Sequence, residues 1–241
     1  MAGALPRRSG LNAAQLKYFA AFMMLLDHID MMFLPLAHLQ GSHPLAAWSL
    51  YFLGRMSFPI FAFFVAEGMR HSRNRRAYLL RLGIFGAVTQ IPFLLGLLTE
   101  GGSIIATFFL SAAGIFTYDR LRTKLPRWVS ILPLLLFALA AHLLSTDFGW
   151  LGVLTPACVY LAGSRKLRFA VLAFFLTLQY LFPWSGGFPD INCWITIGMS
   201  WLAILLIALF YNGERGRIGK WFFYWFYPLH LIVLGGLSMI L

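Results

Sequence analysis

The stretch that decides the fold is residues 16–30, Leu16-Lys17-Tyr18-Phe19-Ala20-Ala21-Phe22-Met23-Met24-Leu25-Leu26-Asp27-His28-Ile29-Asp30. It is apolar from Tyr18 until Asp27, His28 and Asp30 interrupt it. A helix rises about 1.5 Å per residue, so His28 lies roughly 16 Å beyond Lys17, near the middle of a bilayer core about 30 Å thick. An ionisable group at that depth costs at least about 2.5 kcal/mol, so it normally faces the inside of a bundle and has a partner. The stretch predicts a membrane helix with a polar site at mid-depth.

Similar apolar runs follow along the whole chain. Of its 241 residues, 60% are hydrophobic and only 11% are charged, which is unlike a soluble domain. The runs cover residues 16–39, 45–69, 77–98, 103–118, 129–144, 148–163, 168–183, 191–211 and 221–241. We therefore predict an all-α, polytopic membrane helix bundle of about nine transmembrane helices, forming a single domain over residues 1–241. Several middle runs are short, and two of them have the length of a re-entrant hairpin.

Basic residues fix the expected orientation. The net charge is +11, and eighteen of the nineteen Lys and Arg residues lie at one set of helix ends. The alternate loops, at 41–44, 99–103, 145–147 and 183–190, hold no Lys or Arg. The positive-inside rule then predicts a cytoplasmic N-terminus and an external C-terminus. Because these charges lie in short loops between apolar runs, they indicate topology rather than nucleic-acid binding.

Arg55 is the one cation inside an apolar run. It lies about ten residues from the outer end of the second run, so we expect Asp27 or Asp30 to neutralise it and to join the two helices. A purely structural ion pair leaves His28 unexplained, whereas a histidine flanked by carboxylates is suited to act as a base. In the last run, His230 lies two residues after Pro228. It is either a histidine packed in the core or a residue of the site, and the sequence leaves both interpretations open.

A basic cluster follows the second run. The positive-inside rule would account for part of this cluster, but five arginines within twelve residues are more than are needed to orient a helix. The planar guanidinium of arginine can donate two parallel hydrogen bonds to a phosphate, so the cluster is suited to bind a phosphate-bearing ligand. The candidate anion-binding residues are Lys17, Glu67, Arg70, His71, Arg73, Arg75, Arg76 and Arg81. The chain has no Cys-x-x-Cys pattern, phosphate-binding glycine loop or Gly-x-Ser-x-Gly elbow, so we predict no metal site.

Seven blocks of the sequence carry a resemblance to a known family. They are 25–30 (LLDHID), 54–63 (GRMSFPIFAF), 66–74 (AEGMRHSRN), 78–82 (YLLRL), 147–154 (DFGWLGVL), 211–217 (YNGERGR) and 223–230 (FYWFYPLH). In this order they resemble the TraX family, whose namesake N-acetylates conjugative pilin. The fourth span departs from the family pattern of Asn, Thr and Gly, with Ser103, Thr107 and Ser111 in their place. The family is similar to wider groups of transmembrane acyltransferases in which a basic residue precedes a first-helix histidine by eleven positions, the interval between Lys17 and His28.

The resemblance implies a multi-pass acetyltransferase of the bacterial inner membrane that uses cytosolic acetyl-CoA. Its acceptor would be an amine or hydroxyl of a protein or glycan presented from the membrane or its outer side, a pilin N-terminus among the candidates. His28 would be the general base, oriented by Asp27, while Arg55 or His230 stabilises charge and Lys17 guides the donor. The alternative is a proton-coupled transporter that uses the cluster of Asp27, His28, Asp30 and Arg55. A passive scaffold for pilus assembly is a third hypothesis.

Overall fold

The computed structural model describes residues 9–33, 44–94, 102–182, 189–217, 219 and 221–238. Three of the eighteen basic residues predicted at one set of helix ends, Arg7, Arg8 and Lys220, lie outside these ranges, as do most of the loops at 41–44, 99–103 and 183–190. In the described part every regular element is an α-helix, and the β-type pairing is a single bridge between Leu11 and Tyr211. The all-α prediction is confirmed.

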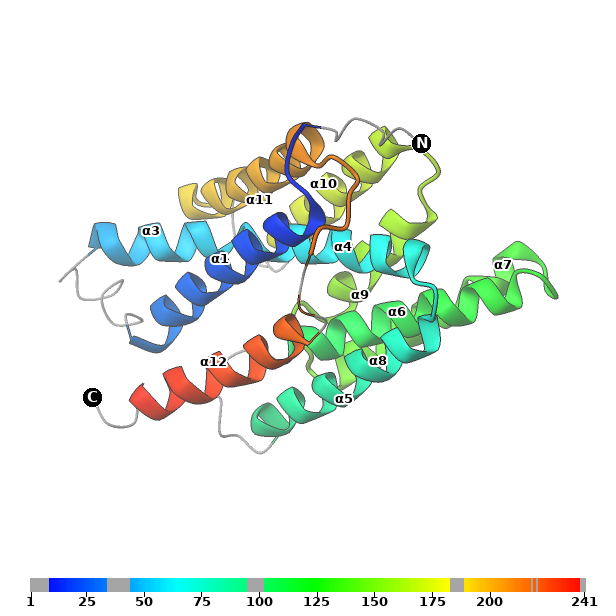
Figure 1. Cartoon of the computed structure of the whole chain (residues 1–241), viewed down its shortest axis with the longest axis horizontal. Helices are drawn as coiled ribbons and strands as arrows, with labels where there is room; N and C mark the ends of the chain where they lie inside the picture. Colours follow the sequence, from blue (N-terminus) through cyan, green and yellow to red (C-terminus); the bar gives the residue numbers. More distant parts are fainter. Residues whose placement is uncertain are drawn as a thin grey trace, which may run out of the picture.

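The helices follow the apolar runs of the sequence (Figure 1). They are α1 (Ala13–Phe33), α3 (Pro44–Gly54), α4 (Ser57–His71), α5 (Arg75–Leu94), α6 (Ile104–Leu121), α7 (Arg127–Ser130), α8 (Leu132–Leu143), α9 (Gly149–Leu161), α10 (Arg165–Leu181), α11 (Ile191–Phe210) and α12 (Phe222–Ser238). Three stretches are long and apolar enough to cross a membrane by length and composition: 47–71, 104–121 and 191–210. The full set of nine spans and the orientation stay predictions.

Short polar side chains fix several helix starts. Ser103, Ser164 and Asp190 each accept a hydrogen bond from the backbone N–H three residues further on, at the first turns of α6, α10 and α11. These bonds satisfy donors that a helix start leaves unpaired, which is costly away from water. The helix starts can therefore lie where the apolar runs begin.

The core surrounds α4. This helix packs against α1, α6, α9 and α11, and Ile60 and Met69 on it are fully buried, as are Leu16 and Ile115 on its neighbours. The outer helices instead expose large apolar side chains, among them Leu136, Trp201 and Ile232. A soluble surface rarely presents so much contiguous apolar area, so these faces are typical of a protein embedded in lipid.

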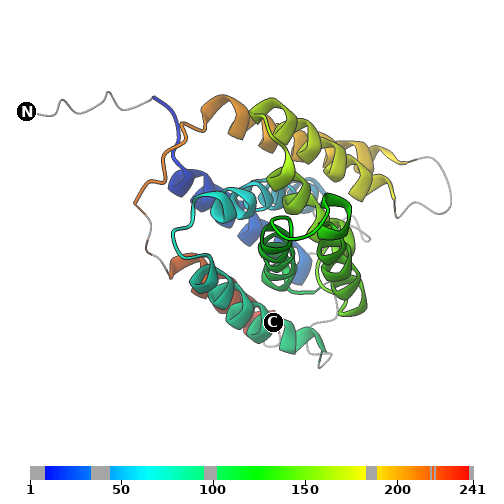
Figure 2. The same cartoon turned by 90° about the vertical axis from the view of Figure 1, so that its right-hand side faces the viewer.

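Helices α5 and α12 lie together on one side of the bundle, across from α1 and α4 (Figure 2). α12 also packs against α1, so the space between these two pairs of helices is closed where α12 and α1 meet. On the opposite flank, α3 approaches α1 closely because residue 54 is glycine. A Cβ atom at Gly54 would come within 2.4 Å of the Asp27 Cβ, so no larger residue fits without movement. These two features position the site.

Candidate active site

A cavity of about 830 Å³ occupies the space between α1, α4, α5 and α12. It is within the size range of small-molecule sites. One end is lined by residues of the basic loops, including His71, Arg73 and Arg215, and we call this end of the bundle the basic end. The other end is lined by Met24, Ile104 and Tyr227. Met24 lies seven residues beyond Lys17 on α1, so the cavity extends about 10 Å along that helix.

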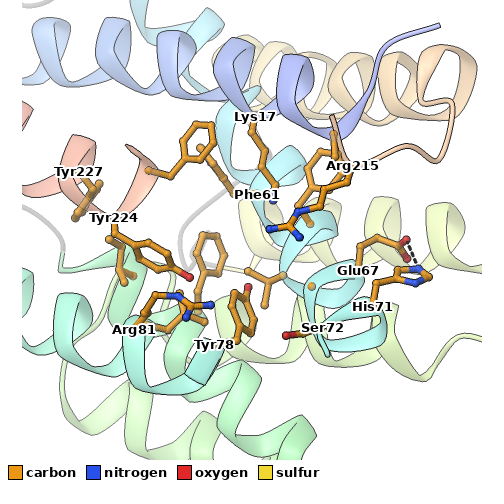
Figure 3. Close-up of a pocket in the computed structure, with 18 of the residues that line it drawn as sticks. Lys17, Phe61, Glu67, His71, Ser72, Tyr78, Arg81, Arg215, Tyr224 and Tyr227 are labelled. Atoms are coloured by element: carbon orange, nitrogen blue, oxygen red, sulfur yellow. Dashed lines mark ion pairs between the residues drawn. The ribbon is translucent and has the colours of Figure 1, made fainter. Parts of the chain in front are cut away.

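Cations converge at the mouth of the cavity. Figure 3 shows Lys17 and Arg215 reaching in from one wall, while Arg81 and Tyr78 reach in from the opposite wall. Lys17 and Arg215 are close enough to repel one another electrostatically. The Lys17 Nζ lies 5.0 Å from the centre of the Phe64 ring, and the Arg81 guanidinium lies 5.7 Å from that of Tyr224. Aromatic faces hold these cations, which leaves their N–H donors available to an anion.

The carboxylate at this mouth has partners of its own. Glu67 accepts a hydrogen bond from Arg168 at 2.9 Å and lies 3.2 Å from the His71 Nε2. It therefore ties α4 to α10, and its charge is already balanced by Arg168. An anion that entered the cavity would meet Lys17, Arg73, Arg81 and Arg215 as its net charge partners.

Two imidazoles stand just beyond the far end of the cavity. His28 lies one helical turn past Met24 on α1, and His230 lies one turn past Phe226 on α12; Met24 and Phe226 both line the cavity. The two rings are edge to face, with 4.8 Å between their centres. Tyr227 closes the group, 6.1 Å from His28. Histidines 202 positions apart thus form one pair, and the role of His230 in the site stays a prediction.

Both histidines are oriented by backbone carbonyls. The His28 Nδ1 is 2.7 Å from the Met24 oxygen, and the His230 Nδ1 is 2.7 Å from the Phe226 oxygen. A carbonyl only accepts, so each Nδ1 carries the proton, and each neutral ring presents Nε2 as its basic nitrogen. The His230 Nε2 is buried and has no hydrogen-bond partner among the described residues. The orienting group predicted for His28 was Asp27, and the structure instead gives this bond to Met24.

Asp27 bonds to Arg55. The Arg55 Nη2 donates to the Asp27 Oδ1, and Gly54 provides the space in which the two helices meet. The Arg55 guanidinium also lies 4.6 Å from the centre of the Tyr51 ring. The predicted ion pair between the first two spans is thus present, with Asp27 as the acid. Asp30 is buried on α1.

The predicted arginine cluster separates into two groups. Arg73 and Arg81 line the cavity with His71, whereas Arg70, Arg75 and Arg76 do not. Arg70 donates to the carbonyl oxygens of Val159, Tyr160 and Ala162. Arg75 bonds to Asp119 at 2.6 Å, and Arg76 is exposed. Two members of the cluster therefore join α4 and α5 to neighbouring helices instead of facing the cavity.

The small residues of the fourth span have a structural role. Thr107 donates to the Asp147 carbonyl at 2.5 Å, and Ser111 donates to that of Val153 at 2.8 Å. The Ser103 hydroxyl lies 2.5 Å from that of Thr89. These bonds join α6 to α5, to the turn before α9 and to α9 itself. The departure from the family pattern thus falls on residues that hold helices together.

Sequence reasoning missed Arg215 and Asp147 as parts of the site. Arg215 joins the cations at the mouth although almost two hundred residues separate it from Lys17. The turn before α9 folds inward, with Phe148 in a left-handed conformation and its ring stacked 4.2 Å from that of Phe58. Asp147 thereby comes close enough to Arg55 to interact with it electrostatically. The sequence did offer one indication of their importance, because Asp147 and Arg215 lie in two of the blocks that resemble the TraX family, 147–154 and 211–217.

Comparison with known proteins identifies the family. The sequence model described as TraX protein matches residues 12–238. The chain belongs to the TraX family. A relative in Dichelobacter nodosus, the probable fimbrial assembly protein FimC of serogroup H1, is 32% identical over 98% of this chain and 100% of its own length. Protein TraX of Escherichia coli is 28% identical to this TraX-family chain over 93% of the chain and 86% of its own length. No solved structure matches the sequence.

Proposed function

We propose that this TraX-family protein is an integral membrane acetyltransferase that takes its acetyl group from cytosolic acetyl-CoA. The observation that carries the proposal is the cavity that leads from a cluster of cations to a pair of imidazoles. The cations would bind the phosphates of the donor, and the aromatic walls, formed by Phe61, Tyr78 and Tyr224 among others, would hold its pantetheine arm (Figure 3). The thioester would then lie at the His28 end.

The chemistry proceeds by acyl transfer. The His28 Nε2 takes the proton from an amine or hydroxyl of the acceptor while that atom attacks the thioester carbonyl carbon. Positive charge must then stabilise the oxyanion of the tetrahedral intermediate, and Arg55 is the cation proposed for this role, while the neutral His230 packs against the His28 ring. When the intermediate collapses, the C–S bond breaks and the proton passes to the sulfur of coenzyme A. The new bond is an amide or an ester.

The acceptor is proposed from the relatives. One is named a probable fimbrial assembly protein and another protein TraX, so we infer a pilin-like protein in the inner membrane as acceptor, with its N-terminal amine as the nucleophile. Its approach would be from the side opposite the basic end, because the basic mouth is assigned to the donor. Mass spectrometry of envelope proteins from cells with and without this gene would identify the species that loses about 42 Da, the mass of one acetyl group.

The donor site can be tested by removing two charges from the mouth. We expect the double variant Arg81→Gln/Arg215→Gln to raise the Kd for acetyl-CoA by about tenfold or more, because each charge-assisted hydrogen bond contributes about 1.5–3 kcal/mol. The matched control is Lys166→Gln/Arg217→Gln, which removes the same charge from exposed positions that do not line the cavity. Isothermal titration with acetyl-CoA in detergent measures both. Equal affinity in the two double variants would contradict the donor assignment.

The proton-coupled transporter remains the alternative because the Asp27–Arg55 pair and the two histidines form a chain of ionisable groups within the bundle. The two functions differ in one measurement. A transporter would move protons across liposomes without an acyl donor, whereas an acetyltransferase would show saturable acetyl-CoA binding and no such flux.

A further inference from the structure

A second cavity lies at the basic end, between α4, α6, α7 and α9, and it shares no lining residue with the larger one. Its volume is about 530 Å³. Three arginines line it, Arg70, Arg122 and Arg127, together with Tyr118, Tyr160 and the turn that follows α9. Among the described residues, no carboxylate belongs to this lining. It is therefore a concave site with a strong positive charge that acetyl transfer does not use.

The nearest carboxylate does not balance these arginines. Asp119 accepts hydrogen bonds from Arg75 at 2.6 Å and from the Tyr160 hydroxyl at 2.5 Å, and it lies 3.1 Å from the Arg122 Nε. One carboxylate is thus shared by two arginines. Arg70 gives its three hydrogen bonds to neutral carbonyl oxygens at the end of α9. Its Nε lies 3.9 Å from the Glu67 Oε1, and that carboxylate is already hydrogen-bonded by Arg168 at 2.9 Å, so Glu67 is also shared by two arginines.

The cavity also lies where a lipid headgroup would lie. Arg127 begins α7, which continues into α8, and Trp128 next to it is 74% exposed. Exposed tryptophans are typical of the membrane–water interface. Beyond it, Leu132, Leu136 and Leu139 are exposed at the spacing of one helix face, a surface suited to acyl chains. A phospholipid with its chains on this face would bring its phosphate to the arginines.

We propose that this cavity binds the phosphate-bearing headgroup of an anionic phospholipid from the cytoplasmic leaflet. Arginine forks match the oxygens of a phosphate, and basic pockets between membrane helices on that side are suited to such headgroups. The absence of a lining carboxylate favours an anionic headgroup over a zwitterionic one, because the ammonium of a zwitterionic lipid would have no partner there. The bound phosphate would link α6 and α7 at a point where arginines otherwise repel.

The test compares two double variants of the full-length protein in neutral detergent. Arg122→Gln/Arg127→Gln removes two lining charges. Arg120→Gln/Lys124→Gln removes two charges outside the lining, one from the last turn of α6 and one from the turn that follows it. The probes are phosphatidylglycerol, phosphatidylcholine and inorganic phosphate, and binding is measured by native mass spectrometry. We expect saturable phosphatidylglycerol binding, weakened about thirty-fold in the first variant, since each basic residue near a membrane surface contributes about 1 kcal/mol. The control should bind like the wild type.

Equal binding in the two double variants would overturn the proposal, and so would phosphatidylcholine binding as tight as that of phosphatidylglycerol. Inorganic phosphate that binds and competes fully at low concentration would assign the site to a free phosphate instead of a lipid. If the double variant fails to fold, Arg127→Gln alone replaces it, because Arg127 is exposed and should tolerate the change. A loss of phosphatidylglycerol affinity in that single variant supports the site, and wild-type affinity overturns it. None of these measurements depends on acetyl transfer.

Discussion

Replacing His28 with alanine is expected to lower kcat for acetyl transfer by about 10²- to 10⁴-fold, the usual contribution of a positioned general base. The reason is geometric. The Met24 carbonyl fixes the proton on Nδ1, so the Nε2 of the neutral ring is available to accept a proton. The ring lies one helical turn past Met24, the last residue of α1 that lines the cavity. Binding of acetyl-CoA should change little, because the cations that hold it lie about three helical turns away.

The measurement is acetyl transfer from radiolabelled acetyl-CoA by purified protein, with the KM for the donor and the thermal stability determined in parallel. His142→Ala is the matched control, since His142 is exposed on α8 and lines neither cavity. Its activity should equal that of the wild type. A His28→Ala protein that folds and retains full kcat would show that another group removes the proton. A change in KM alone would place His28 in donor binding.

The ladder of helices could be predicted from the sequence because membrane insertion acts on local composition. Each apolar run was expected to become a helix, since a helix satisfies its own backbone in lipid. In the described residues each run is helical, although the run 45–69 is divided between α3 and α4 and the run 129–144 between α7 and α8. The polar exceptions within the runs were equally informative. Asp27, His28, Arg55 and His230 lie close together in the structure because burial in lipid forces such groups to find one another.

Which partner each group takes could not be predicted from spacing. Asp27 and Asp30 lie about 60° apart around α1, so either could have faced Arg55. The choice depends on the close approach at Gly54, a tertiary contact. Arg70 and Arg73 are likewise three residues apart, yet Arg70 bonds to the end of α9 while Arg73 lines the cavity. A sequence does not show whether a basic residue orients a membrane helix, joins two helices or binds a ligand. The packing of the helices decides which of these roles it has.

Replacing Arg55 should destabilise the protein more than replacing its partner Asp27. Arg55 is the counterion of Asp27 and also interacts with Asp147, so Arg55→Gln leaves two carboxylates near one another without a cation between them. Breaking a buried ion pair costs about 3–5 kcal/mol, which for a chain of this length lowers Tm by roughly 6–20 °C. In Asp27→Asn the Arg55 guanidinium still has the Asp147 carboxylate nearby as a counterion, so the loss of stability should be smaller. Thermal unfolding in detergent ranks the two variants.

The double variant Asp27→Asn/Arg55→Gln separates the structural role of this pair from a chemical one. It removes both members of the ion pair together, so it should be more stable than Arg55→Gln alone, because a pair replaced by neutral groups leaves fewer uncompensated charges. If the double variant is more stable than Arg55→Gln and has the kcat of the wild type, the role of the pair is to join α1 to α3. If it is more stable than Arg55→Gln but its kcat is well below that of the wild type, Arg55 also acts on the reaction. A double variant less stable than both single variants would contradict the ion pair itself, since its members would then contribute independently to folding.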